Sequence, residues 1–343
     1  MTLDQAAALS LLENLPRTNL LARLQAPDPE LMETAERGAA HATAVREGAR
    51  RRGIHFLPWN DARFPPALLA TPDCPPGLWC RGSFDCLARP MVAVVGSRSG
   101  SPVALETAAR LGEELAGRGV TVVSGLARGV DSAAHRGALR GGVTVAVLGS
   151  GLDRIYPAEH VGLADEIAAA GAVVTEYAPW TPPLKFNFPM RNRIISGLSR
   201  AVVVIEASEQ SGSLITASCA LEQGREVMAV PGNVLSGRNR GGHGLIRDGA
   251  KIVECADDIL SELGFAPGGG QRSSDESSRC SQRSSGDSLL SRMEPGQAYD
   301  LEALAALTGV AAVRLIPRLC ELELDGSVCR AGGGRFMRAS RTC

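Results

Sequence analysis

Six short apolar runs, rich in valine, recur through the middle of the chain. They read MVAVV, VTVVS, VTVAVL, AVVTE, AVVVIE and EVMAV, and they fall between residues 91 and 230. Continuous apolar runs of this length are typical of strands that are buried on both faces, as in a parallel sheet. The segments between them, such as PVALETAARLGEELAGRG, have the apolar spacing of helices. This alternation predicts an α/β domain with a doubly wound, mostly parallel sheet.

The pattern changes before this domain. Residues 1–52 are expected to form a small helical N-terminal domain, because LDQAAALSLLENL and the segments after it carry apolar residues at helical spacing. Residues 53–90 are richer in proline, tryptophan and cysteine, which predicts short strands and turns that lead into the sheet. The central domain is therefore expected to span residues 53–265.

The pattern changes again after it. Residues 266–288 are rich in glycine, serine and charge, so they are predicted to be a flexible linker. Residues 289–343 have the pattern of two helices joined at Gly309 and followed by a β-hairpin, which predicts a winged helix. Pro317 falls inside the second of these helices, so that helix is expected to start later or to be kinked.

Composition and charge narrow the class of protein. The net charge of the 343 residues is −1, so any nucleic-acid site must come from local clustering of basic residues. The nine cysteines have no spacing typical of metal ligands, and no metal or cofactor is expected. The N-terminus lacks the features of a signal peptide, and no apolar run approaches the roughly 18 residues that span a bilayer. These features predict a cytoplasmic protein without a membrane anchor.

Glycine, serine and arginine gather where the predicted strands end. The sequence reads GSRSGS after the first run, SGLARGVD after the second and EASEQSGS after the fifth, while FPMRNRIISGLS precedes the fifth. The carboxyl ends of parallel strands meet at the ligand-binding edge of a sheet. Glycine-rich turns and guanidinium groups both favour anions, so the sequence predicts a site for a chain of phosphates. The candidate phosphate contacts are Arg98, Arg128, Lys185, Arg191 and Arg193, and the candidates for stacking on bases are Phe186 and Phe188.

The sequence lacks the motifs of several enzyme classes that bind phosphates in such a sheet. The GxGxxG fingerprint of dinucleotide binding and the GxxxxGK[ST] P-loop are both absent. His135 lies four residues after Asp131 and would suit a general base, although a histidine packed within a helix explains it equally well. Ser211 suits a helix cap better than a nucleophile. Glu176 and Glu206 would either bind donors in the pocket or orient the arginines, and the sequence leaves both roles open.

The motifs VAVVGSR, SGLARGVDSAAH, LGSGLDRIYP, FPMRNRIISGLS and VVVIEASEQSGSLITA, in this order, resemble the DprA/Smf family of DNA-processing proteins. The resemblance implies a Rossmann-like domain and a C-terminal winged helix. It further implies a homodimer that binds single-stranded DNA and helps to load the RecA recombinase during natural transformation, without catalysis. Together with the positive residues gathered at the strand ends, the resemblance predicts DNA binding by Gly96, Ser97, Arg98, Gly125, Arg128, Lys185, Arg191, Asn192, Arg193, Ser211 and Gly212.

The chain also departs from the family pattern. ENLPRTNLL lacks the Gly-Ile-Gly turn that often marks a DNA-binding N-terminal unit. The family often has a lysine soon after the Tyr156–Pro157 position, whereas Glu159 follows here, so one phosphate contact is expected to be missing or moved. Family analogy places the dimer interface at about residues 226–262.

Two other functions stay open at this point. A Rossmann-like nucleotide phosphoribohydrolase of the lysine-decarboxylase-like group would share the sheet, but its PGGxGTxxE motif does not occur in this chain. A regulator that binds duplex DNA would act through residues 289–343. Deletion of that tail would abolish its DNA binding, whereas a single-strand-binding protein would retain much of its affinity.

Overall fold

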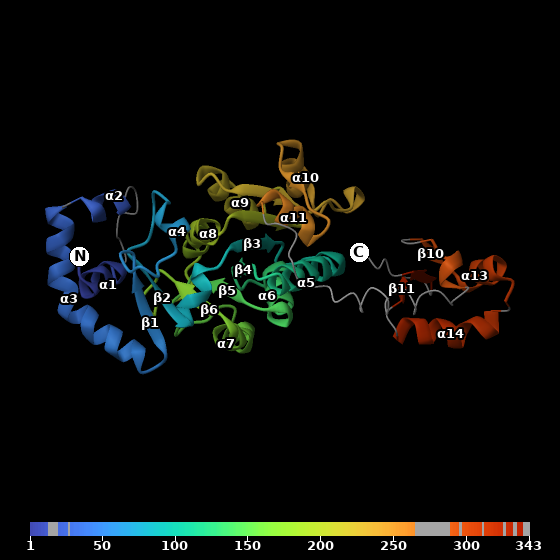
Figure 1. Cartoon of the computed structure of the whole chain (residues 1–343), viewed down its shortest axis with the longest axis horizontal. Helices are drawn as coiled ribbons and strands as arrows, with labels where there is room; N and C mark the ends of the chain where they lie inside the picture. The colour runs from blue at the N-terminus through green and yellow to red at the C-terminus, as the bar shows by residue number, and fades with distance from the viewer. Residues whose placement is uncertain are drawn as a thin grey trace. The chain divides into compact units, whose positions relative to one another are not determined.

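The structure is a computed structural model. The chain forms two compact units, Met1–Gly268 and Gly269–Cys343 (Figure 1). It describes residues 1–12, 20–26, 28–264, 289–294, 297–310, 312–324, 327–331 and 335–338. The predicted linker and most of the ENLPRTNLL segment lie outside the described residues. No helix in the described part of the chain is both long and apolar enough to cross a membrane.

A nine-stranded sheet organises the first unit, in the order β1-β2-β6-β5-β4-β3-β7-β8-β9. The six predicted strands all form, and each pairs in parallel with its neighbours among the six. They are β3 (Met91–Gly96), β4 (Thr121–Ser124), β5 (Thr144–Val147), β6 (Ala172–Thr175), β7 (Ala201–Ile205) and β8 (Glu226–Ala229). A short strand, β9 (Lys251–Ile252), extends this edge in parallel. The predicted Rossmann-like, mostly parallel α/β fold is confirmed.

The segment before β3 belongs to the same sheet. The strands β1 (Ile54–Pro58) and β2 (Gly77–Gly82) pair antiparallel, and β2 pairs antiparallel with β6. The short helices α4 (Pro66–Leu69) and η1 (Phe84–Ala88) accompany them. The N-terminal helices α1 (Leu3–Ser10), α2 (Leu20–Gln25) and α3 (Pro29–Arg50) lie beside this end of the sheet (Figure 1). Trp79 of β2 is fully buried, and its Nε1 donates to Ser10 Oγ at 3.2 Å, so the helices and the sheet share one compact unit.

Helices cover both faces of the sheet because the strands are apolar on both sides. In β3, Val92 and Val94 pack with residues of α5 (Pro102–Gly117), α6 (Val130–Gly141) and α11 (Ala256–Glu262). Ala93 and Val95 pack on the other face with residues of α8 (Asn187–Leu198) and α9 (Gly212–Glu222). The remaining helices of this unit are η2 (Ala158–His160), α7 (Val161–Ala170), η3 (Val234–Ser236) and α10 (Arg240–Arg247).

The order of the strands creates the crevice that holds the site. From β3 the chain moves outward through β4, β5 and β6, then crosses back to continue as β7 and β8 on the other side of β3. Connections therefore diverge at the carboxyl ends of β3 and β7, where open α/β sheets bind ligands. Gly96 ends β3 here, and a Cβ at this residue would lie 1.9 Å from the carbonyl oxygen of Ile205. The glycine lets the two strands close together at the crevice.

The second unit contains the two predicted helices and the predicted hairpin, together with a short helix, η4, and a short strand, β10, that the sequence did not predict. They are η4 (Leu290–Arg292), β10 (Ala298–Tyr299), α13 (Leu301–Thr308), α14 (Ala312–Leu324), β11 (Val328–Ala331) and β12 (Arg335–Arg338). The strands β11 and β12 form the expected hairpin, and β10 joins β12. Gly309 ends α13 with φ of 73°. The helix α14 runs through Pro317, so of the two expected alternatives the later start is wrong and the kink stays a prediction. Assignment of this unit as a winged helix stays a prediction.

Candidate nucleic-acid interface

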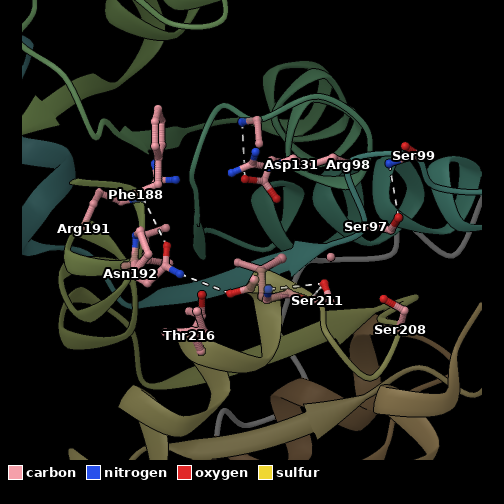
Figure 2. A pocket seen from close by; sticks show the side chains of 18 residues that line it. Ser97, Arg98, Ser99, Asp131, Phe188, Arg191, Asn192, Ser208, Ser211 and Thr216 are labelled. Atoms are coloured by element: carbon pink, nitrogen blue, oxygen red, sulfur yellow. Dashed lines mark hydrogen bonds between the residues drawn. The ribbon is translucent and has the colours of Figure 1, made fainter. Parts of the chain in front are cut away.

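A pocket of about 450 Å³ opens at the carboxyl ends of β3, β4 and β7. Figure 2 shows that its side chains come from the loop after β3, from the start of α6, from α8 and from the start of α9. The residues that carry its chemistry are Ser97, Arg98, Asp131, Phe188, Arg191, Asn192, Ser208, Ser211 and Thr216. The pocket therefore lies at the point where the strand order reverses.

The loop after β3 is held in place by backbone hydrogen bonds. The Ser97 N–H donates to the carbonyl oxygen of Glu206 at 2.9 Å, and the Ser101 N–H donates to Glu206 Oε1 at 2.9 Å. On the other side, the Val130 N–H donates to the carbonyl oxygen of Ser97 at 3.1 Å. Glu206 thus braces the loop, and its Oε1 also lies 3.8 Å from Arg238 Nη1, so it both accepts from a backbone donor and pairs with an arginine.

Arg98 stands on this loop with its side chain exposed. Its guanidinium carbon lies 5.7 Å from the centre of the Phe188 ring, within the range of a cation–π contact. Tyr156 approaches the same ring, with 5.5 Å between the ring centres. Within the described part of the chain, no carboxylate pairs with Arg98. Its donors are therefore available to an anion that enters the pocket.

Arg191 has a different position, because its side chain lies beneath the pocket and is almost fully buried. Its Nη1 donates to the carbonyl oxygen of Gly125 at 2.8 Å and to that of Val147. Burial lowers the pKa of Arg191 to about 10, so it stays charged at neutral pH. The residue joins the ends of β4 and β5, and it contributes positive charge to the floor of the pocket.

Asp131 lies beside Arg191 and was not among the predicted binding residues. Its Oδ2 accepts hydrogen bonds from the Gly125 N–H at 3.1 Å and the Ala127 N–H at 3.4 Å. Burial raises the pKa of this carboxyl, against the opposing effect of the Arg191 charge. The signal in the sequence is an acid at the start of a helix, directly after a glycine-rich turn. Its spacing from His135 had suggested only a role as the partner of that residue.

His135 does not take part in this arrangement. Its Nδ1 lies 2.7 Å from Thr144 Oγ1, and burial lowers its pKa to about 3. His135 is not among the described residues that line the pocket. Its ring is buried between α6, which carries it, and Thr144 of β5. The alternative that it packs within the protein is therefore the one that the structure supports.

The other predicted phosphate contacts fall in three different places. Arg193 is buried, with Nη2 at 2.6 Å from Glu176 Oε2, and the structure does not bring it into the pocket. Glu176 therefore orients an arginine, which is one of the two roles that the sequence left open for it. Arg128 pairs with Glu159 and lines a smaller pocket of about 140 Å³, which shares Arg98 and Phe188 with the main one. Lys185 is exposed and is absent from the described lining of both pockets.

The start of α9 completes the wall of the pocket. Ser211 is the N-cap of this helix, as predicted, and its Oγ accepts from the Ser213 N–H at 3.4 Å. Asn192 Nδ2 donates to the carbonyl oxygen of Gly212 at 3.2 Å, which joins α8 to α9. Ser211 Oγ also lies 2.7 Å from Ser213 Oγ, so it is bonded to another hydroxyl rather than to a base. This wall offers polar groups for binding.

Comparison with known proteins gives consistent results over most of the chain. Residues 55–264 match the family described as DNA recombination-mediator protein A. The chain is similar to Protein Smf of Escherichia coli (strain K12), with 41% identity over 295 residues that cover 84% of this chain and 78% of that protein.

Two solved structures resemble this fold. The DNA processing protein A (DprA) of Streptococcus pneumoniae gives a TM-score of 0.62 with 39% identity, over 73% of this chain and 87% of that one. The DNA processing protein A of Helicobacter pylori, a structure that concerns its single-stranded DNA binding mode, gives a TM-score of 0.56 with 30% identity. This second match covers 61% of this chain and 95% of that one.

Proposed function

The chain belongs to the DNA recombination-mediator protein A family, and we propose that it binds single-stranded DNA in the pocket at the ends of β3, β4 and β7. One observation carries this proposal. Arg98 has an exposed guanidinium without a carboxylate partner among the described residues, and it stands 5.7 Å from the ring of Phe188. A cation beside an aromatic ring is the combination that binds the phosphate and the base of one nucleotide.

The rest of the pocket fits the same ligand. Arg98 would hold a backbone phosphate, and the buried charge of Arg191 would attract it further. Phe188 would stack on a base, while the hydroxyls of Ser97, Ser208 and Ser211 offer hydrogen bonds at the wall. Base stacking does not depend strongly on sequence, so the site would accept strands of varied sequence.

We further propose that the protein works without catalysis as a cytoplasmic recombination mediator that passes incoming strands to RecA during natural transformation. The bonding of Ser211 to Ser213 and the internal position of His135 support binding rather than a nucleophilic reaction. A homodimer through residues 226–262 would place two pockets on one strand and raise affinity through effective concentration. Apolar side chains are exposed in that segment, since Leu235 has a relative exposure of 93% and Ile252 of 52%.

The proposal is tested by fluorescence anisotropy of a labelled single strand and of its duplex, titrated at several salt concentrations. We expect the wild type to prefer the single strand. Each phosphate contact on a single strand contributes about −0.7 to the slope of log K against log salt, so Arg98→Ala should bind more weakly with a shallower slope. Arg89→Ala is the matched control, because Arg89 is exposed and is absent from the described lining of the pockets. Equal affinity for the duplex, or an unchanged slope in Arg98→Ala, would contradict the proposal.

A further inference from the structure

A second pocket of about 260 Å³ lies between the N-terminal helices and the segment that joins β6 to α8. We call it the aromatic pocket, and its principal walls are formed by Leu12, Leu20, Tyr177, Trp180, Leu184 and Phe186. Trp180 has a relative exposure of 47% and Phe186 of 66%, so large aromatic surfaces face solvent here. Neither ring is needed to fill the core of the unit.

One buried polar group at the aromatic pocket has no hydrogen-bond partner among the described residues. Asn187 lines the pocket with a relative exposure of 1%, and its Nδ2 donates no hydrogen bond to any described residue. A buried donor without an acceptor is unfavourable, because its hydration is lost and nothing replaces it. The Nδ2 atom has no accessible surface in this structure, so a ligand acceptor would satisfy it only after the wall of the pocket opens toward it.

The aromatic pocket adjoins the proposed DNA site through the first turn of α8. Asn187 lines the aromatic pocket and the next residue, Phe188, lines the DNA site. The Tyr177 hydroxyl donates to the carbonyl oxygen of Asn187 at 3.4 Å, which fixes this turn against the wall of the aromatic pocket. Lys185, two residues before Asn187 in the sequence, is exposed.

We propose that the aromatic pocket is a second nucleobase subsite, which takes a base farther along the single strand that is held at Arg98 and Phe188. Exposed aromatic faces stack on any base, and every base carries an acceptor for the Asn187 amide. The volume is below the roughly 300–1,000 Å³ of pockets that enclose drug-sized ligands, so it suits one ring system. This inference rests on the proposed function, because it extends the path of the same strand.

Trp180 supplies a direct optical test. The chain has three tryptophans, and Trp180 is the most exposed of them, since Trp79 is fully buried and Trp59 is half-buried. Stacking of a base on Trp180 should quench its fluorescence. We expect quenching by a thymidine strand of about 16 nucleotides and little by one of about four, which would fill only the site at Phe188. Trp180→Leu should remove the length-dependent part of the signal.

Affinity gives an independent measurement. Trp180→Leu should bind the long strand about 5- to 150-fold more weakly, which corresponds to one stacked base, and should bind the short strand as the wild type does. Leu221→Ala is the control, because Leu221 has a relative exposure of 62% and is absent from the described lining of the pockets. Thermal melting of each variant confirms that it is folded before its affinity is compared.

Three results would contradict the proposals, and they distinguish failure of the second subsite from failure of the proposed function. The second subsite is wrong if the long strand does not quench the wild type and binds Trp180→Leu with wild-type affinity. An apolar peptide then becomes the better occupant of the aromatic pocket. If the short strand loses as much affinity as the long one, the substitution acts on the site at Phe188 and the second subsite is again wrong. If the wild type binds neither strand, the proposed function itself fails.

Discussion

The Nη1 atom of Arg191 donates a hydrogen bond of 2.8 Å to the carbonyl oxygen of Gly125, at the point where β4 ends. The same atom donates to the carbonyl oxygen of Val147 at the end of β5. A Cβ on Gly125 would lie 2.5 Å from Arg191 Nη2, so the guanidinium packs directly under the turn. Arg191 therefore holds the floor of the pocket together as well as giving it charge.

Arg191→Leu should accordingly reduce both stability and binding. The substitution leaves two buried carbonyl oxygens without this donor and leaves the buried Asp131 carboxylate without its neighbouring cation, which should cost about 3–5 kcal/mol in the free energy of unfolding. Urea unfolding measures this loss, and anisotropy below the melting temperature measures binding. The exposed Arg98 provides the contrast, since Arg98→Ala should weaken binding and leave stability within about 0.5 kcal/mol of the wild type. Wild-type stability of Arg191→Leu would refute this account of the floor.

Substitution of Arg193 should lower stability and leave single-strand binding unchanged, which is the reverse of the effect expected for Arg98→Ala. Its guanidinium is buried between Glu176, at 2.6 Å, and Asp73, at 3.1 Å. Arg193→Leu should lower the free energy of unfolding by about 3–5 kcal/mol, because it leaves the Glu176 carboxylate buried without its cation. The affinity of the folded variant for a single strand should stay within about twofold, a difference below 0.5 kcal/mol.

A second variant separates lost charge pairing from lost packing at Arg193. In the double variant Arg193→Leu, Glu176→Leu both buried charges are absent, so it should recover much of the stability that the single variant loses. Denaturant midpoints of the wild type and the two variants test this order. A large fall in single-strand affinity with unchanged stability would instead place Arg193 at the DNA.

The sheet was largely predictable because burial leaves a direct trace in the sequence. Strands such as β3 and β7 are covered on both faces, so almost every position is apolar, and valine fits the pleated surface. The strands β1 and β2 gave a weaker signal, since proline and polar residues interrupt them. Their antiparallel places beside β6 depend on pairing with a distant strand, which no local pattern specifies.

The site was predictable only in part, because the direction of a side chain depends on the helix that carries it. The loop arginine Arg98 follows a parallel strand, so the rule for strand ends placed it correctly at the pocket. Arg191 and Arg193 are two residues apart in α8, and about 100° per residue puts them roughly 200° apart around the helix. The prediction that both arginines contact phosphates overlooked this spacing, which puts the two side chains on different sides of the helix. Which of the two faces the pocket depended on how α8 packs on the sheet.

Glu159 should limit the affinity of the site, because it pairs with Arg128 at the smaller adjoining pocket. Glu159→Gln removes a negative charge and frees Arg128, so single-strand affinity should rise and the salt slope should steepen by up to about 0.7. The hydrogen bond from Arg128 lowers the pKa of Glu159, so mild acidification would not produce the same change. Glu113→Gln, which breaks a similar exposed pair with Arg140, is the control. Unchanged affinity in Glu159→Gln would show that Arg128 does not reach the strand.

The stability of the first unit should depend on pH through His135, which is fully buried between α6 and β5. Thr144 Oγ1 donates to the carbonyl oxygen of Val122 at 2.7 Å, so the His135 Nδ1–H is the group that donates to Thr144. Burial lowers the pKa of His135 to about 3, and the positive charge of Arg191 acts in the same direction. The folded protein therefore keeps this ring neutral at any pH above that value.

The unfolded chain binds a proton at His135 with an ordinary pKa of about 6.5, so below that pH the unfolded state holds one more proton than the folded state. The stability that His135 contributes is complete above pH 6.5 or so and falls as the pH drops toward about 3. From this residue alone, the free energy of unfolding should decrease by about 2 kcal/mol between pH 7 and pH 5. His135→Asn keeps an amide donor for Thr144 but cannot bind the proton, so its urea-unfolding free energy should fall less over the same interval. The comparison uses the difference between the two pH values within each protein, because the substitution also changes packing. Equal pH dependence in both proteins would mean that His135 gains its proton in the folded state, and that the interior of α6 admits water.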